Sequence, residues 1–188
     1  MFKTLIRATT VAMLTFGTVG LVAAPAFAKT MMVGGAPMYA TKNIVENAVN
    51  SKVHTTLVAA VKAAGLVDTL MSAGPFTVFA PVNSGFAKLP AGTVETLLKP
   101  ENKATLVKIL TAHVVAGKIS GADLKKMITD GGGKTKLKTV SGDTLVASMK
   151  GKSIILTDES GGSSKVTIAD VNQSNGVIHV VNNVLLPK

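Results

Sequence analysis

The sequence predicts an α+β fold in which helices come first and strands follow. Between residues 43 and 130, apolar side chains recur every three or four positions, which is the period of an amphipathic helix. From Lys136 onward the period changes to two, and short apolar runs alternate with turn residues such as Ser141-Gly142-Asp143. Helices and strands that are segregated along a chain favour α+β over alternating βαβ units. We therefore expect an α+β domain with a helix-rich first half and a strand-rich second half.

The helical half divides into short segments. The pattern starts near Asn43, and a stronger helix follows Thr55, with Gly65 at the position of a C-terminal cap. The sequence Ser120-Gly121-Ala122-Asp123 resembles a capping box, with Asp in place of the usual Glu, and predicts the start of another helix. Further helical segments are predicted at residues 66–70, 83–89, 93–98 and 101–111.

The strands are predicted from β-branched and aromatic runs. Phe76–Ala80 is such a run inside the helical half, and it is expected to join the sheet of the second half. The strands of the second half are predicted at residues 137–140, 144–149, 153–157, 165–168 and 177–186.

The N-terminal segment has the features of a secretory signal peptide. Lys3 and Arg7 give a positive start, no charge follows between Ala8 and Ala24, and Ala26-Phe27-Ala28 forms an A-x-A cleavage site. A membrane anchor is the alternative, but the uncharged run of about 17 residues is at the short limit for a span. We expect residues 1–28 to be removed after Ala28, which places the mature chain in a periplasm or outside the cell.

Residues 29–42 lack any hydrophobic period. They contain Gly34-Gly35, Pro37 and three methionines, and they are expected to form a flexible tail. The folded domain is therefore predicted at residues 43–188. No later segment is long and apolar enough to act as a stable transmembrane anchor.

Composition excludes several classes of protein. A chain that is 47% hydrophobic is not disordered, and the absence of cysteine excludes a disulfide scaffold, a zinc ribbon and a cysteine nucleophile. The net charge of +10 favours an acidic partner, such as an anionic polysaccharide, lipid headgroups or an acidic protein. With no Trp and one Tyr, a base-stacking surface for nucleic acid is not expected. The charge also serves solubility, and alternation in Lys134–Lys138 indicates one solvated strand face.

Motifs for catalysis, metals and cofactors are missing from the sequence. Gly133-Lys134-Thr135 resembles the end of a phosphate loop, but the required first glycine is Ile128. There is no G-x-S-x-G elbow, and the three histidines form no H-x-x-x-H pair. No metal, cofactor or catalytic residue is predicted, although a Ser-His-Asp triad assembled in space stays open.

Three segments together resemble the fasciclin (FAS1) domain family. Phe76–Phe86 is similar to its T-V-F-A-P-T-[ND]-x-A-F box, and Leu110–Lys118 is similar to its L-x-Y-H-V-V-x-G-K segment. The third segment, from Ala169 to Pro187, is similar to the closing N-G-x-I-H-x-[IV]-[DN]-x-V-L-x-P box. The resemblance implies a β-wedge or sandwich with helices along it, acting as a non-catalytic module in cell, matrix or host contacts. Some relatives bind apolar pigments.

The resemblance also implies a candidate partner surface at Thr111, Ala112, His113 and Val114. The Tyr of the family's Y-H pair is Ala112 here, and loss of that side chain is expected to leave a shallow groove. The alternative for His113 is a buried structural role, because it shares a helical face with Leu106 and Leu110.

Three further residues of the matching segments are expected to be structural. Asn83 is predicted to cap the short helix that follows Pro81, and Asp170 to bond backbone groups at a strand exit. His179 alternates with valines and is expected to be half-buried in the sheet. Gly85 replaces a small residue of the family box, which costs about 1 kcal/mol of helix propensity.

The sequence thus predicts an exported adhesion or interaction protein that binds cell-surface or matrix partners. The alternative is a carrier of a small apolar ligand, such as a carotenoid or another lipid, in an apolar groove. An enzyme is the third reading, and it requires a Ser or Asp within hydrogen-bond reach of His113 or His179.

Overall fold

The computed structural model describes residues 30–188, so the predicted signal peptide at residues 1–28 lies outside the described residues. The strands are β1 (Met31–Val33), β2 (Ala36–Met38), β3 (Phe76–Pro81), β4 (Val114–Ala116), β5 (Lys134–Lys138), β6 (Thr144–Lys150), β7 (Ser153–Thr157), β8 (Ser163–Gln173) and β9 (Gly176–Val181). The helices are α1 (Ile44–Ala48), α2 (Thr55–Ala64), α3 (Val67–Met71), α4 (Asn83–Phe86), α5 (Thr93–Leu97), the short 3-10 helix η1 (Pro100–Asn102), α6 (Lys103–Ala112) and α7 (Gly121–Asp130). The predicted α+β class is confirmed.

The main sheet joins the two halves of the chain. Its order is β4-β3-β9-β8-β7-β6-β5, so β3 lies inside the sheet, as predicted for Phe76–Ala80. β3 pairs with β9 in parallel, with Phe76 opposite Gly176, and the other neighbours pair antiparallel. A bridge between Val115 and Thr139 brings the two edges of the sheet together, which curls it almost into a barrel.

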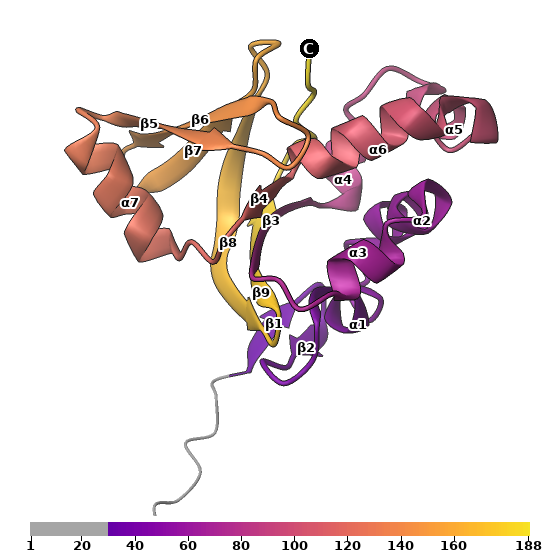
Figure 1. The fold of residues 1–188 in the computed structure, drawn as a ribbon, viewed down its shortest axis with the longest axis horizontal. Coiled ribbons are helices and arrows are strands. Elements are labelled where there is room, and N and C mark those ends of the chain that lie inside the picture. Colours follow the sequence, from indigo (N-terminus) through magenta and orange to yellow (C-terminus); the bar gives the residue numbers. More distant parts are fainter. Residues whose placement is uncertain (1–29) are drawn as a thin grey trace, which may run out of the picture.

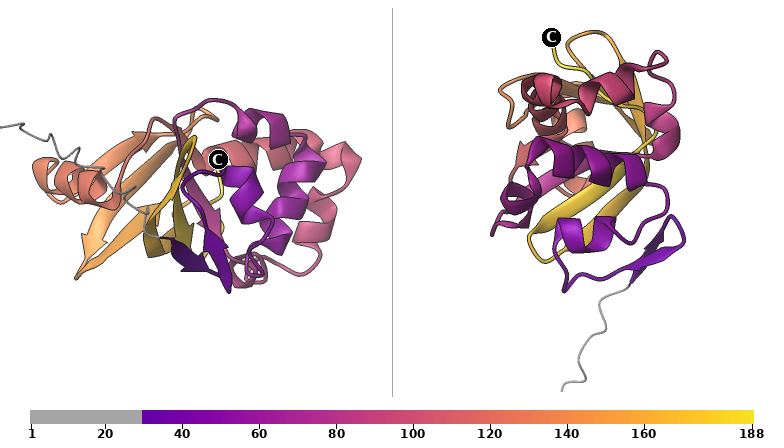
Figure 2. Two further views of the ribbon diagram at one scale, coloured as in Figure 1. Left: turned by 90° about the horizontal axis from the view of Figure 1, so that it is seen from below. Right: turned by 90° about the vertical axis from the view of Figure 1, so that its right-hand side faces the viewer.

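Two hydrophobic cores lie on the two sides of this curled sheet. The interior core is formed by side chains such as Phe79, Leu145 and Leu156, and α7 packs onto it through Leu124 and Ile128. The outer core lies between β3, β9 and the remaining helices. Figures 1 and 2 show the result, with α7 at the end of β5–β7 and the other helices gathered at the opposite end of the molecule.

The expectation of a flexible tail at residues 29–42 is wrong for its described part. β1 and β2 pair as a hairpin, and Val33, Ala36 and Met38 are buried in the outer core. Gly34 and Gly35 have φ of 60° and 78°, as a two-residue hairpin turn requires. The hairpin was missed because three-residue strands are too short for a hydrophobic period to be visible.

Several strand boundaries differ from the predicted ones. β5 begins earlier and ends at Lys138, because the residues that follow bond β4, with Val140 N–H donating to Val114 O at 2.8 Å. β8 is longer than expected and contains register shifts between Val166 and Val171. β9 ends at Val181, and the apolar run that follows leaves the sheet to make other contacts.

Candidate functional site

Asp170 and His179 form one hydrogen-bonded cluster at the start of α7. Asp170 lies in the irregular part of β8 with φ of 61°, and its Oδ1 accepts the Gly121 N–H at 2.7 Å. His179 Nδ1 accepts the Asp170 N–H at 3.3 Å, and its Nε2–H donates to Ile119 O at 2.9 Å. The Asp170 side chain thus bonds a backbone group, but from within a strand and not from a strand exit.

His179 is fully buried, at 0% exposure, and not half-buried as predicted. Its ring stacks on Phe79 inside the sheet, with centroids 5.6 Å apart. Burial lowers its pKa, so the ring is neutral and serves as a polar link between β8, β9 and the loop before α7.

His113 links α6 to the C-terminal segment. Its side chain is 2% exposed, its Nδ1–H donates to Ile109 O at 2.8 Å, and its Nε2 accepts the Leu185 N–H at 2.9 Å. Burial lowers its pKa to about 4, which keeps the ring neutral and able to both donate and accept. His113 is thus a buried side chain whose two nitrogens both bond the backbone.

The sequence predicted that Asn83 caps the helix that follows Pro81, but Asn83 does not cap this helix, α4. The N-cap of α4 is Val82, and Asn83 Oδ1 instead accepts the Thr56 N–H at 3.0 Å, in the first turn of α2. Its Nδ2 donates to Lys52 O and to Thr55 Oγ1. A residue 27 positions away thus satisfies one free amide of α2, that of Thr56, and local spacing could not reveal this partner.

The predicted partner surface at residues 111–114 is largely buried. Ala112 and His113 are each 2% exposed and Val114 is 6% exposed, so the expected surface groove at Ala112 is wrong. Only Thr111 is partly exposed, and its hydroxyl donates to Val107 O at 2.7 Å. These residues form an inner wall and not a rim.

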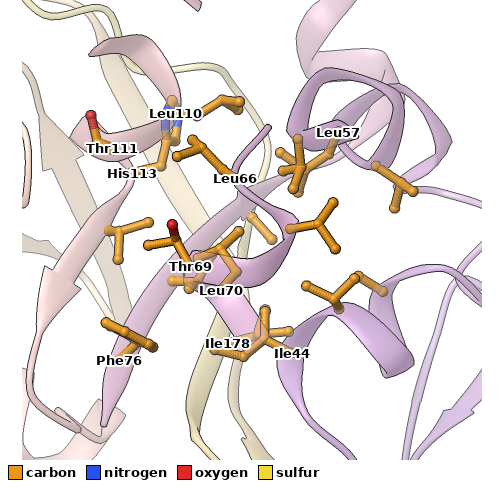
Figure 3. Close-up of a pocket in the computed structure, with 18 of the residues that line it drawn as sticks. Ile44, Leu57, Leu66, Thr69, Leu70, Phe76, Leu110, Thr111, His113 and Ile178 are labelled. Carbon is orange, nitrogen blue, oxygen red and sulfur yellow. The ribbon is translucent and has the colours of Figure 1, made fainter. Parts of the chain in front are cut away.

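An apolar cavity lies next to that wall, between α1, α2, α3, α6 and strands β3, β4 and β9. Its volume is about 70 Å³. Thr111, His113 and Val114 contribute to its lining, whereas Ala112 does not. Figure 3 shows the surrounding side chains as mostly carbon, with Leu57, Leu66, Leu70, Phe76 and Ile178 among those labelled.

The few polar groups in the lining are already bonded or exposed. The His113 nitrogens and the Thr111 hydroxyl bond backbone carbonyls or amides, so they offer nothing to a ligand. Lys62, Thr69 and Val140 are exposed and also line the cavity, which therefore reaches the surface between them. The arrangement suits an apolar group that enters from this side.

A buried Ser-His pair was not anticipated from the sequence. Ser51 Oγ lies 2.8 Å from His54 Nδ1 and 3.3 Å from Val33 O, with exposures of 1% for Ser51 and 3% for His54. Both side chains are buried beneath the N-terminal hairpin, so a substrate cannot reach the Ser51 hydroxyl. His113 and His179 bond backbone groups instead of a Ser or Asp side chain. Among residues 30–188, no group of three or more His, Asp or Glu is placed to hold a metal ion.

Comparisons with known proteins agree with this geometry. A family model described as the fasciclin domain matches residues 52–187. Protein sll1483 of Synechocystis sp. is 47% identical over 163 residues, which covers 85% of this chain and 81% of that protein. Transforming growth factor-beta-induced protein ig-h3 of Sus scrofa is 38% identical over 132 residues, covering 70% of this chain and 17% of that protein.

A solved structure shares the fold. It is a FAS1 domain pair from the insect cell adhesion molecule fasciclin I, with a TM-score of 0.68 and 18% sequence identity over 76% of this chain and 50% of that chain. In the part of the chain that the structure describes, no helix has both the length and the apolar character needed to span a bilayer.

Proposed function

The chain belongs to the fasciclin domain family, and we propose that it is an exported, non-catalytic interaction module that holds cell-surface or matrix partners by contact. The observation that carries the proposal is that the polar side chains of the family segments are used for hydrogen bonds within the protein. Asn83, His113, Asp170 and His179 all bond backbone groups inside the protein. They build a rigid scaffold, and recognition is left to exposed side chains and loops.

The burial of the histidines supports a non-catalytic role. A general base must reach the proton that it abstracts, and all three histidines are at most 3% exposed. Burial lowers the pKa of each ring, so none carries a charge near neutral pH.

The test is saturable binding of the labelled mature chain, residues 29–188, to surface and matrix material isolated from its own host. We expect binding that saturates and weakens with added salt, because the chain carries an excess of positive charge. Retention that never saturates, or no retention at all, would contradict the proposal.

The apolar cavity favours a second candidate, a carrier of a small apolar ligand. A cavity of about 70 Å³ is far below the 300–1,000 Å³ of sites that enclose drug-sized molecules. It therefore has room for part of an alkyl chain or one end of a larger molecule, and a whole carotenoid would need the surrounding helices to move apart.

Organic extraction of the chain purified from its own host tests this candidate. The matched variant is Thr69→Phe, which places a ring at the exposed side of the cavity. A carrier yields a defined lipid or pigment from the wild type and much less from the variant. Equal amounts from both, or none from the wild type, argue against it.

A further inference from the structure

Five exposed lysines share the outer face of strands β5 to β8. They are Lys134, Lys136 and Lys138 on β5, Lys150 at the end of β6 and Lys165 on β8. Successive side chains of a strand point to opposite faces, and the intervening residues, such as Leu137 and Leu145, are buried in the interior core. The five lysines, which we call the lysine face, therefore lie together on the solvent side.

The positive charge of the lysine face is not neutralised within the protein. The ion pairs found in the described part of the chain join Lys99 to Glu101 and Lys126 to Asp130, both away from this face. The strand residues that point outward here include no Asp or Glu. At one end of the face, the Glu159 carboxylate accepts the Thr144 N–H beside Lys138.

Hydroxyl groups lie beside several of the lysines. Strand pairing places Lys134 opposite Ser148, Lys150 opposite Ser153 and Thr157 opposite Ser163, so β6 and β7 present hydroxyls between β5 and β8. Alternate residues of a strand are roughly 7 Å apart, and three strand spacings make a face roughly 15 Å wide. Figure 1 shows α7 on the other side of β5–β7 and the remaining helices at the far end, so the described elements leave this face open.

We infer that the lysine face binds a linear polysaccharide that carries carboxylate or sulfate groups. This inference rests on the proposed interaction function and names the partner class and its site. The regular spacing of cations suits a polymer with regularly spaced anions, and the hydroxyls can bond sugar hydroxyls between the charged contacts.

Other polyanions fit this face less well. A lipid surface is normally held by large apolar or aromatic side chains as well as by lysines. The outward apolar residues here are the partly buried Val146 and Ile155, and no aromatic residue lies on the strands of this face. The same lack of aromatic side chains removes the stacking platform that single-stranded nucleic acid uses.

The test compares wild-type residues 29–188 with the K134Q/K136Q/K138Q variant by calorimetric titration. The probes are polygalacturonate for carboxylates and dextran sulfate for sulfates, with unmodified dextran as the neutral control. The matched variant is K52Q/K99Q/K103Q, which loses the same charge from the helical layer. All six positions are exposed, so the folds should survive, and circular dichroism checks this.

We expect at least one charged polymer to bind the wild type in a salt-sensitive way, and dextran not to bind. The β5 variant should bind about tenfold more weakly, because each exposed charge contact contributes a factor of about two to three. The matched variant should stay within about twofold of the wild type, since long-range attraction is largely screened at physiological salt.

Several outcomes would overturn the inference. These are no binding of either charged polymer, equal weakening by both triple variants, or tighter binding to duplex DNA or to anionic vesicles. If the inference is wrong but the K134Q/K136Q/K138Q variant still binds host surface material saturably, the proposed function is retained. The proposed function itself fails if the wild type does not bind that material saturably.

Discussion

The burial of His113 predicts a specific loss of stability in acid. Burial holds the ring's pKa at about 4, against an ordinary value of 6.5, although the Ile109 carbonyl and the Asp158 carboxylate partly oppose this shift. Between these two pH values the unfolded chain binds a proton at His113 and the folded chain does not. The free energy of unfolding therefore falls as the pH drops, by about 2 kcal/mol between pH 7 and pH 5 and by about 3 kcal/mol in all.

Urea unfolding of the wild type and the His113→Gln variant at pH 7, 6 and 5 measures this contribution. Glutamine has no charge in this range, and it can still accept the Leu185 N–H while losing the bond to Ile109 O. The variant should be less stable at pH 7 but should lose about 2 kcal/mol less on acidification. His54 and His179 are retained in both proteins, so their own lowered pKa values cancel in the comparison.

The reasoning is refuted if the two proteins lose the same stability between pH 7 and pH 5. A direct check is an NMR titration of the wild-type ring, which should not be half-protonated above pH 5. A ring that titrates near 6.5 would mean that His113 is solvated and does not form the link between α6 and the C-terminal segment.

Three further substitutions test the packing by chemical denaturation. Asn83→Ala should cost about 2 kcal/mol, because the Thr56 amide at the start of α2 loses its acceptor and the bonds to Lys52 O and Thr55 Oγ1 are lost as well; a cost near zero would mean that water replaces them. Asp170→Ala should cost more than Asp170→Gly, because both lose the bond to α7 but only glycine tolerates the positive φ without strain; the reverse order would contradict this. Gly85→Ala should destabilise by at least about 1 kcal/mol despite the better helix propensity, since the new Cβ would lie 2.9 Å from Asn182 O; stabilisation would show that the backbone yields there.

Local chemistry carried much of the fold prediction. The capping box at Ser120 and the left-handed cap at Gly65 lie where the sequence placed them, since such signals act within a few residues. The Asn175-Gly176 turn was also anticipated. The long-range bonds of Asn175 were not predicted. Its side chain accepts the Ile44 N–H and donates to Leu70 O, and both partners are more than 100 positions away.

The candidate site was harder to predict because it depends on the packing of distant segments. The spacing of His113 from Leu106 and Leu110 indicated burial, but its acceptor bond to Leu185 depends on where the chain goes after β9. The cavity beside it is a volume left unfilled by seven elements, and periodicity does not report volume. The lysine face shows the opposite case. The alternation within Lys134–Lys138 already predicted that the β5 lysines face solvent. Only the strand pairing in the structure shows that Lys165 lies on the same face.

The most direct measurement incubates the mature chain with isolated matrix material of its host and analyses both by mass spectrometry after separation. Our account predicts salt-reversible retention, with the protein and the retained material chemically unchanged. Release of a cleaved or modified product that depends on the folded chain would contradict it.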